Sequence, residues 1–152
     1  MDKKMSLMGV AGKIVLVLFI SLMITEGISF FFKPAFKITG NYEKLAVLAA
    51  VMAISGFTLN LIAAFGMLSA YRKGQLATKG LYSVFLNPMY TFQILVTVPG
   101  LLLLFNSWLV TAAVIPVFIA FKVFVGEEER YLEMKFGDRY REYRKKVLFK
   151  FL

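Results

Sequence analysis

The chain has 152 residues, 59% of them hydrophobic, and a mean hydropathy of +0.72. It is too short for two soluble domains and too apolar for an ordinary soluble domain, so we expect a membrane protein. The sequence lacks cysteine and histidine, which excludes disulfides, thiolate metal sites and a cysteine nucleophile and removes the commonest general base. We therefore expect no metal site. The net charge of +9 is better explained by membrane topology than by nucleic-acid binding.

Four apolar stretches predict an all-α membrane bundle of about four transmembrane helices within one domain covering residues 1–152. The first stretch carries one charge, Glu26, and its exit does not resemble a signal cleavage site. Pro99 interrupts the third stretch and is expected to kink that helix or end it early. Trp108 suits one interface, and Lys122 can extend toward the other. The expected spans are residues 14–32, 45–71, 89–105 and 108–125.

After the last span, residues 127–147 predict a cytoplasmic amphipathic helix. We expect this helix to pack over the cytoplasmic ends of the last two spans. Its acidic residues come first and its basic residues crowd the end, as the helix dipole favours. Five apolar or aromatic residues recur at spacings of three and four, which places them on one face. They are Leu132, Phe136, Tyr140, Tyr143 and Val147.

Basic residues predict the orientation. The N-terminal segment from Lys3 to Lys13, the connection 72–79 and the tail together carry 14 Lys or Arg residues, against three in the segment 33–44. The positive-inside rule then places both termini in the cytoplasm and residues 33–44 outside. The lack of cysteine and of an organelle-targeting segment favours a prokaryotic cytoplasmic membrane.

Two segments could carry chemistry. Glu127, Glu128 and Glu129 can form a solvated first helical turn, or they can accept hydrogen bonds from the hydroxyl or amine groups of a polar ligand. Asn87 and Pro88 suit the N-cap and first position of the third span, and nearby tyrosines suit an aromatic belt. Each segment alone has this ordinary structural explanation.

Taken together and in order, these segments resemble a known family. Gly80-x-Tyr82, Asn87-Pro88-x-Tyr90, an apolar hairpin with Asn106-Ser107-Trp108, Glu128-Glu129 and Phe136-Gly137-x-x-Tyr140-x-x-Tyr143-x-x-x-Val147 are similar to motifs of integral-membrane methyltransferases. The family is that of the isoprenylcysteine carboxyl methyltransferases and phospholipid methyltransferases. The resemblance covers roughly residues 78–147, and its tail motif is the most specific part because several residue types are fixed at once.

This resemblance implies S-adenosylmethionine as the cofactor, bound in a cytoplasm-facing pocket that the C-terminal helix covers. It implies methyl transfer to a lipid-like or small amphiphilic acceptor in the bilayer, a reaction that needs neither metal nor cysteine. The acceptor's reacting group, the catalytic residue and the oligomeric state stay open. The residues carried over as cofactor-binding are Tyr82, Asn87, Pro88, Tyr90, Glu128, Glu129, Tyr140 and Tyr143.

The chain departs from the family pattern at Leu86 and Asn87, where relatives usually carry Arg-His. Asparagine can replace histidine as a hydrogen-bonding group, whereas leucine cannot replace arginine. Lys79, Arg141 and Arg144 are candidates for a substitute cation. Loss of the arginine also leaves room for a catalytically inactive relative.

Two other classes of function compete. Glu26 inside a four-helix membrane protein fits a small proton-coupled exporter, because an intramembrane carboxylate is a functional candidate. The second competing class is a membrane scaffold, which would bind partner proteins through its tail helix.

Overall fold

The computed structural model describes residues 9–150, so the basic residues Lys3 and Lys4 lie outside the described part. Within that part the regular elements are all helical, which confirms the predicted class. Their bounds are α1 Gly9–Phe31, α2 Lys33–Phe36, α3 Tyr42–Arg72, the 3₁₀ turn η1 Gly80–Ser83, α4 Pro88–Phe92, the π turn η2 Gln93–Thr97, α5 Val98–Leu103, α6 Trp108–Thr111, α7 Val114–Phe136 and α8 Asp138–Lys146.

Three described stretches are long and apolar enough to cross a membrane: Val10–Phe31, Tyr42–Arg72 and Trp108–Phe136. This makes the protein a multi-pass membrane protein. The predicted third span, 89–105, corresponds to Pro88–Leu103, an apolar helix that ends two residues earlier and is shorter than the other three. At 1.5 Å per residue it measures about 24 Å, less than the roughly 30 Å of a hydrocarbon core. A fourth complete crossing therefore stays a prediction.

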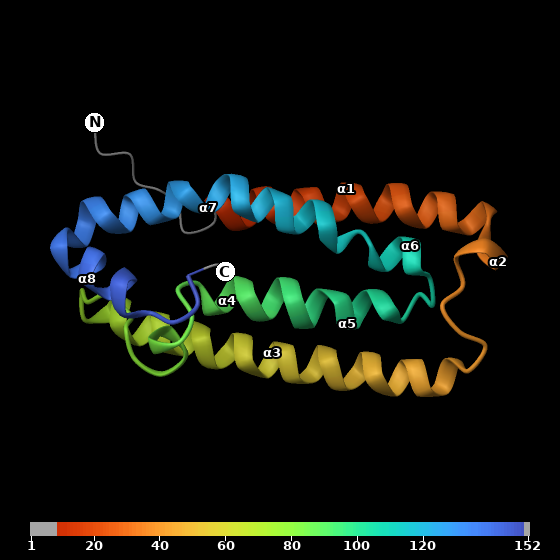
Figure 1. The fold of residues 1–152 in the computed structure, drawn as a ribbon, viewed down its shortest axis with the longest axis horizontal. Coiled ribbons are helices and arrows are strands. Elements are labelled where there is room, and N and C mark those ends of the chain that lie inside the picture. The colour runs from red at the N-terminus through yellow and green to blue at the C-terminus, as the bar shows by residue number, and fades with distance from the viewer. Residues whose placement is uncertain (1–8, 151–152) are drawn as a thin grey trace.

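The helices form two antiparallel pairs that lie side by side (Figure 1). In one pair α1 packs along α7, and in the other α3 packs along the continuous helix formed by α4, η2 and α5. Buried side chains of α1, η2 and α7 join the two pairs, and a second cluster links α5 to α6. Many large apolar side chains of α1 and α3 stay exposed, as expected for helices that face lipid.

Pro99 neither breaks nor ends its helix, which continues to Leu103. The five residues before Val98 form a π turn, a wider coil in which the ladder of hydrogen bonds is already shifted before the proline. The neighbouring Gly100 lets this helix approach α3 closely. A Cβ atom there would lie only 2.7 Å from the backbone nitrogen of Ala53.

The C-terminal third differs from the prediction. The expected span 108–125 is divided by a turn at Ala112 and Ala113, and Pro116 lies in the first turn of α7, where the missing N–H costs little. From there α7 runs without interruption through residues 125–127 to Phe136. The predicted single helix over residues 127–147 is therefore wrong, because these residues belong to the end of α7 and to α8. The chain turns between the two helices at Gly137, whose φ of +54° suits glycine.

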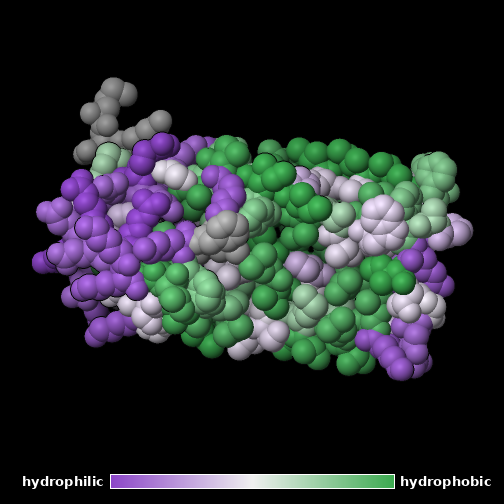
Figure 2. All heavy atoms as spheres, viewed as in Figure 1, coloured by the Kyte–Doolittle hydropathy of each residue, from purple (hydrophilic) through white to green (hydrophobic). Residues whose placement is uncertain are grey.

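Polar residues gather at one end of the bundle, and an apolar band covers its middle (Figure 2). We call the end formed by α8, the connection 73–87 and the last turns of α7 the polar end. The opposite end, formed by α2, residues 37–41 and residues 104–108, is called the far end. The predicted cofactor-binding residues lie at the polar end, whereas the Asn106-Ser107-Trp108 motif lies at the far end.

Candidate functional site

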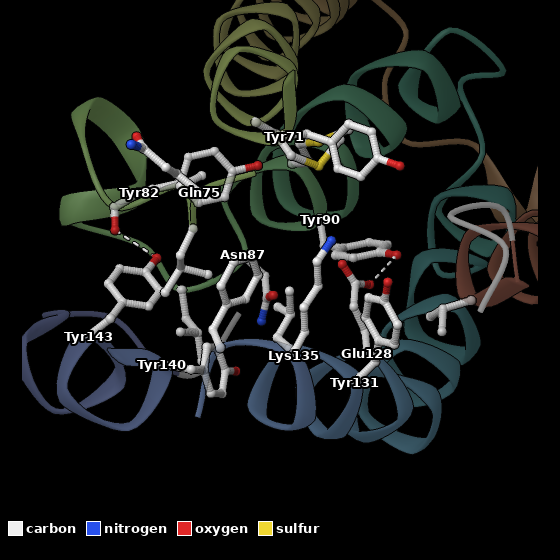
Figure 3. Close-up of a pocket in the computed structure, with 18 residues that line it drawn as sticks. Tyr71, Gln75, Tyr82, Asn87, Tyr90, Glu128, Tyr131, Lys135, Tyr140 and Tyr143 are labelled. Carbon is white, nitrogen blue, oxygen red and sulfur yellow. Dashed lines mark hydrogen bonds between the residues drawn. The ribbon is translucent and has the colours of Figure 1, made fainter. Parts of the chain in front are cut away.

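The polar end contains a cavity of about 660 Å³. Pockets for small ligands are typically about 300–1,000 Å³. The end of α3, the connection 75–87, the start of α4, the last turns of α7 and the face of α8 all contribute to its lining (Figure 3). Leucine, methionine and phenylalanine side chains form much of the wall, and a small number of polar groups lie among them.

Six of the eight residues predicted to bind the cofactor line this cavity. They are Tyr82, Asn87, Tyr90, Glu128, Tyr140 and Tyr143. The other two do not line it. Pro88 is fully buried at the start of α4, where it occupies the first turn as expected. Glu129 forms an ion pair with Arg144 at 3.0 Å, and this pair connects α7 to α8.

Glu128 is held at the cavity by Tyr90. The Tyr90 hydroxyl donates a hydrogen bond of 3.0 Å to Oε2 of Glu128, which joins the start of α4 to α7 (Figure 3). The Tyr90 ring also packs on Phe121 of α7, with the ring centroids 5.0 Å apart. One carboxylate oxygen is thereby oriented, and the other has no partner among the described residues.

Side chains of α8 cover the cavity from one side. The Tyr143 hydroxyl donates to the carbonyl oxygen of Tyr82 at 2.8 Å, which fixes α8 against the connection 73–87. The backbone of Phe149 exchanges hydrogen bonds of 2.9 Å with Val84 and Leu86, so the chain beyond α8 is attached to the same connection. The predicted aromatic stripe therefore packs into one cluster, although two helices carry it.

Three tyrosines that line the cavity, one from η1 and two from α8, are neutral at ordinary pH. Burial raises the pKa of Tyr82, Tyr140 and Tyr143 above that of a free phenol. For Tyr82 the neighbouring Tyr143 and Glu128 act in the same direction. Glu129 does so for Tyr140. Each of the three phenols is therefore a hydrogen-bonding group rather than a base.

The side chains of Tyr140 and Asn87 at the cavity have polar groups that the local structure does not use. The Tyr140 hydroxyl is buried and has no hydrogen-bond partner within residues 9–150. Asn87 lies at the N-cap position of α4, but its side chain does not cap the helix. Buried polar groups in folded proteins nearly always have partners, so the unpaired Tyr140 hydroxyl beside a cavity points to a ligand.

Four polar lining residues were not singled out from the sequence: Tyr71, Gln75, Tyr131 and Lys135. Tyr131 and Lys135 follow Glu128 by three and seven residues, so the predicted helix 127–147 already places all three on one face, and this spacing is the signal that could have identified them. Tyr71 and Gln75 come from α3 and the residues after it, and no pattern in the sequence connects them with α7.

None of the three residues that the sequence suggested as a substitute cation lines the cavity. Arg141 binds Glu133 and Asp138 on the exposed side of α8, and Arg144 binds Glu129. Lys79 does not line the cavity. Leu86, which stands where relatives usually carry arginine, is buried and contributes an apolar part of the wall.

The helices and this cavity define a class: a multi-pass membrane protein with a cavity at its polar end. Comparison with protein families identifies the family, because residues 42–139 match the model of the phospholipid methyltransferase family. The match covers more than half of the chain, and the protein belongs to this family. Its resemblance to membrane methyltransferases is thus confirmed. Neither the curated proteins nor the solved structures yielded a match.

Proposed function

We propose that the protein transfers a methyl group from S-adenosylmethionine to a lipid-like or small amphiphilic acceptor at the membrane interface. The observation that carries this proposal is the cavity at the polar end. It brings together six residues that are far apart in the sequence, and four of them lie within the segment that matches the family. The same cavity is open to a ligand with both charged and aromatic parts, because its lining contains both kinds of group.

The lining groups fit S-adenosylmethionine chemically. The cofactor has an ammonium, a carboxylate, a sulfonium, a ribose diol and an adenine ring. Glu128 can accept hydrogen bonds from the ammonium or the diol, and the amide of Asn87 can both donate and accept. Tyrosine rings suit the adenine and the sulfonium, since aromatic faces attract cations. The buried, unpaired hydroxyl of Tyr140 is a further site for a polar contact.

The two predicted residues outside the cavity receive supporting roles. Pro88 starts α4 and so places Asn87 and Tyr90 at the wall. Glu129 holds α8 through Arg144 and so keeps Tyr140 and Tyr143 over the cavity. We accordingly assign cofactor contact to the six lining residues and positioning to Pro88 and Glu129.

Bound S-adenosylmethionine supplies an electrophilic methyl group on a sulfonium, whose sulfur leaves as a neutral thioether. The protein must hold the acceptor in line with that methyl group and keep water away. The apolar wall around Leu86, Met89 and Leu132 excludes water. The hydrogen bond from Tyr90 keeps the Glu128 carboxylate in one orientation before any ligand arrives, so less ordering remains to be done on binding.

We place the polar end on the cytoplasmic side of a prokaryotic membrane. Most basic residues lie there, as the positive-inside rule requires. An exporter that uses Glu26 has no comparable support, since Glu26 lies on α1 and lines neither described cavity. A pure scaffold would have no use for an unpaired carboxylate oxygen and an unpaired phenol at the same cavity.

Calorimetric titration with S-adenosylhomocysteine tests the proposal. We expect saturable one-site binding by the purified protein in detergent, and a loss of about tenfold or more in Glu128→Gln, because a hydrogen bond to a charged group contributes about 1.5–3 kcal/mol. Glu142→Gln is the matched control. It removes an exposed acidic charge of α8 that does not line this cavity, and should bind within about threefold of the wild type.

Absence of heat from folded wild-type protein at millimolar ligand would reject the proposal. Equal losses in the two glutamine variants would instead contradict the assignment of Glu128 as the contact residue. Once binding is established, incubation with radiolabelled S-adenosylmethionine and amphiphiles carrying an amine, a carboxylate or a thiol identifies the acceptor class.

A further inference from the structure

Lys135 is the basic side chain that lines the cavity. It comes from the same face of α7 as Glu128, two helical turns further on. Figure 3 shows its side chain extending from α7 across the cavity, between Asn87 and Glu128. Its ammonium lies 5.2 Å from the ring centroid of Tyr71 on α3, so it reaches across to the opposite helix.

Three aromatic rings surround this ammonium. Besides Tyr71, the centroids of Tyr131 and Phe136 lie 5.9 and 5.4 Å from it, all within the range of a cation–π contact. Rings attract the charge but accept none of the directed hydrogen bonds that an ammonium makes. The three N–H donors of Lys135 are therefore available to an anion that enters the cavity.

Each acidic side chain of α7 has a partner other than Lys135. The pairs are Glu127 with Lys13, Glu128 with Tyr90, Glu129 with Arg144 and Glu133 with Arg141. Within residues 9–150 no carboxylate forms an ion pair with Lys135. A cation at the mouth of an apolar cavity without a counter-ion favours an anionic ligand, because a hydrogen bond between an ammonium and a carboxylate is stronger than one between neutral groups.

We propose that Lys135 binds the carboxylate of the amino-acid part of the ligand and so supplies the cation that Leu86 cannot provide. The proposal rests on the function proposed above. Glu128 and Lys135 then present opposite charges from one helix face to the ammonium and the carboxylate of one zwitterion. The pocket would thus select a nucleoside that carries an amino acid over a nucleoside that lacks the carboxylate.

The test compares two ligands that differ only in that carboxylate: S-adenosylmethionine and its decarboxylated analogue, titrated calorimetrically without an acceptor. We expect Lys135→Gln to weaken binding of S-adenosylmethionine by about 10- to 100-fold and binding of the analogue by less than about twofold. Lys135→Arg should retain the preference for the carboxylate. Lys146→Gln, on α8 and outside this cavity, is the charge-matched control.

Lys135 is exposed at the mouth, so the substitutions should fold, and thermal unfolding without ligand checks this. An equal loss for both ligands overturns the proposal, because Lys135 would then merely shape the mouth. Unchanged binding of both ligands with a loss of transfer to an anionic acceptor also overturns it. In either case the wild type still binds, so the proposed function survives, whereas a wild type that binds neither ligand refutes both.

Discussion

The two ends of the bundle differ in whether their polar side chains have hydrogen-bond partners within the described part of the chain. At the far end the groups satisfy one another. The Asn106 side chain exchanges two hydrogen bonds with the backbone of Thr39, at 3.0 and 3.1 Å. Ser29 donates to Ser107 at 2.8 Å, with both side chains buried, and the Tyr42 hydroxyl donates to the carbonyl of Leu104.

At the polar end several polar groups lack hydrogen-bond or ion-pair partners among the described residues. The Tyr140 hydroxyl lacks a partner in the described part of the chain, the Asn87 side chain caps nothing, and Lys135 has aromatic rings but no carboxylate. These three groups come from different elements and line one cavity. Of the three, the Tyr140 hydroxyl is buried, and an unsatisfied buried polar group costs about 1–3 kcal/mol, which a bound ligand would offset.

The difference separates a structural end from a binding end. Both ends have loops, aromatic residues and cations, so composition does not distinguish them. What distinguishes them is whether the neutral hydroxyl and amide groups named above have partners among the described residues. The predictions below test this distinction, beginning with the largest expected effect.

Asn106→Ala should lower the free energy of unfolding by about 2–3 kcal/mol, measured in mixed detergent micelles. The substitution removes both hydrogen bonds to Thr39 and places alanine at a φ of +50°. Asn106→Gly loses the same bonds without the steric cost and should be about 1 kcal/mol less destabilised. Binding of S-adenosylhomocysteine should not change in either variant, and a changed affinity would show that the ends are not independent.

Tyr143→Phe should lower the free energy of unfolding by about 1 kcal/mol, because it leaves the carbonyl of Tyr82 without its donor. Tyr140→Phe is the matched change on the same helix. It removes a hydroxyl without a partner and should change the stability of the ligand-free protein by less than about 0.5 kcal/mol. The reverse order of stabilities would contradict the assignment of Tyr140 as the unused group.

Tyrosine ionisation gives the smallest and most local signal. Burial raises the pKa of Tyr82, Tyr140 and Tyr143, so the folded protein holds their protons more tightly than the unfolded chain does. Their contribution to stability is complete below the ordinary phenol pKa of about 10 and is lost as the pH rises above it.

An absorbance titration of tyrosinate should show fewer ionised residues in native than in denatured protein at a pH of about 10–11. Tyr143→Phe should remove one of the late-titrating groups. Coincident titration curves for native and denatured protein would contradict the burial of these phenols.

Much of the helical framework could be predicted from the sequence. Apolar stretches of membrane length and the turn residues between them depend on local composition, so α1 and α3 lie close to their predicted bounds, whereas α7 starts and ends later than the predicted span 108–125. The motif residues also identified the right end of the molecule. Boundaries were wrong where a local signal was ambiguous: the acidic run at 127–129 was taken as a helix start, but α7 continues through it and ends at Gly137.

The sequence by itself determined an all-helical membrane protein of the phospholipid methyltransferase family, with its distinctive residues before α4 and along α7 and α8. Only the tertiary structure decided which of two adjacent glutamates faces the cavity, because neighbouring helical residues point about 100° apart and the rotation of α7 depends on its packing. The position of Lys135 at the cavity likewise depends on the tertiary structure. Its place opposite Tyr71 depends on how α3 and α7 approach each other, and no local pattern encodes a distance between two helices.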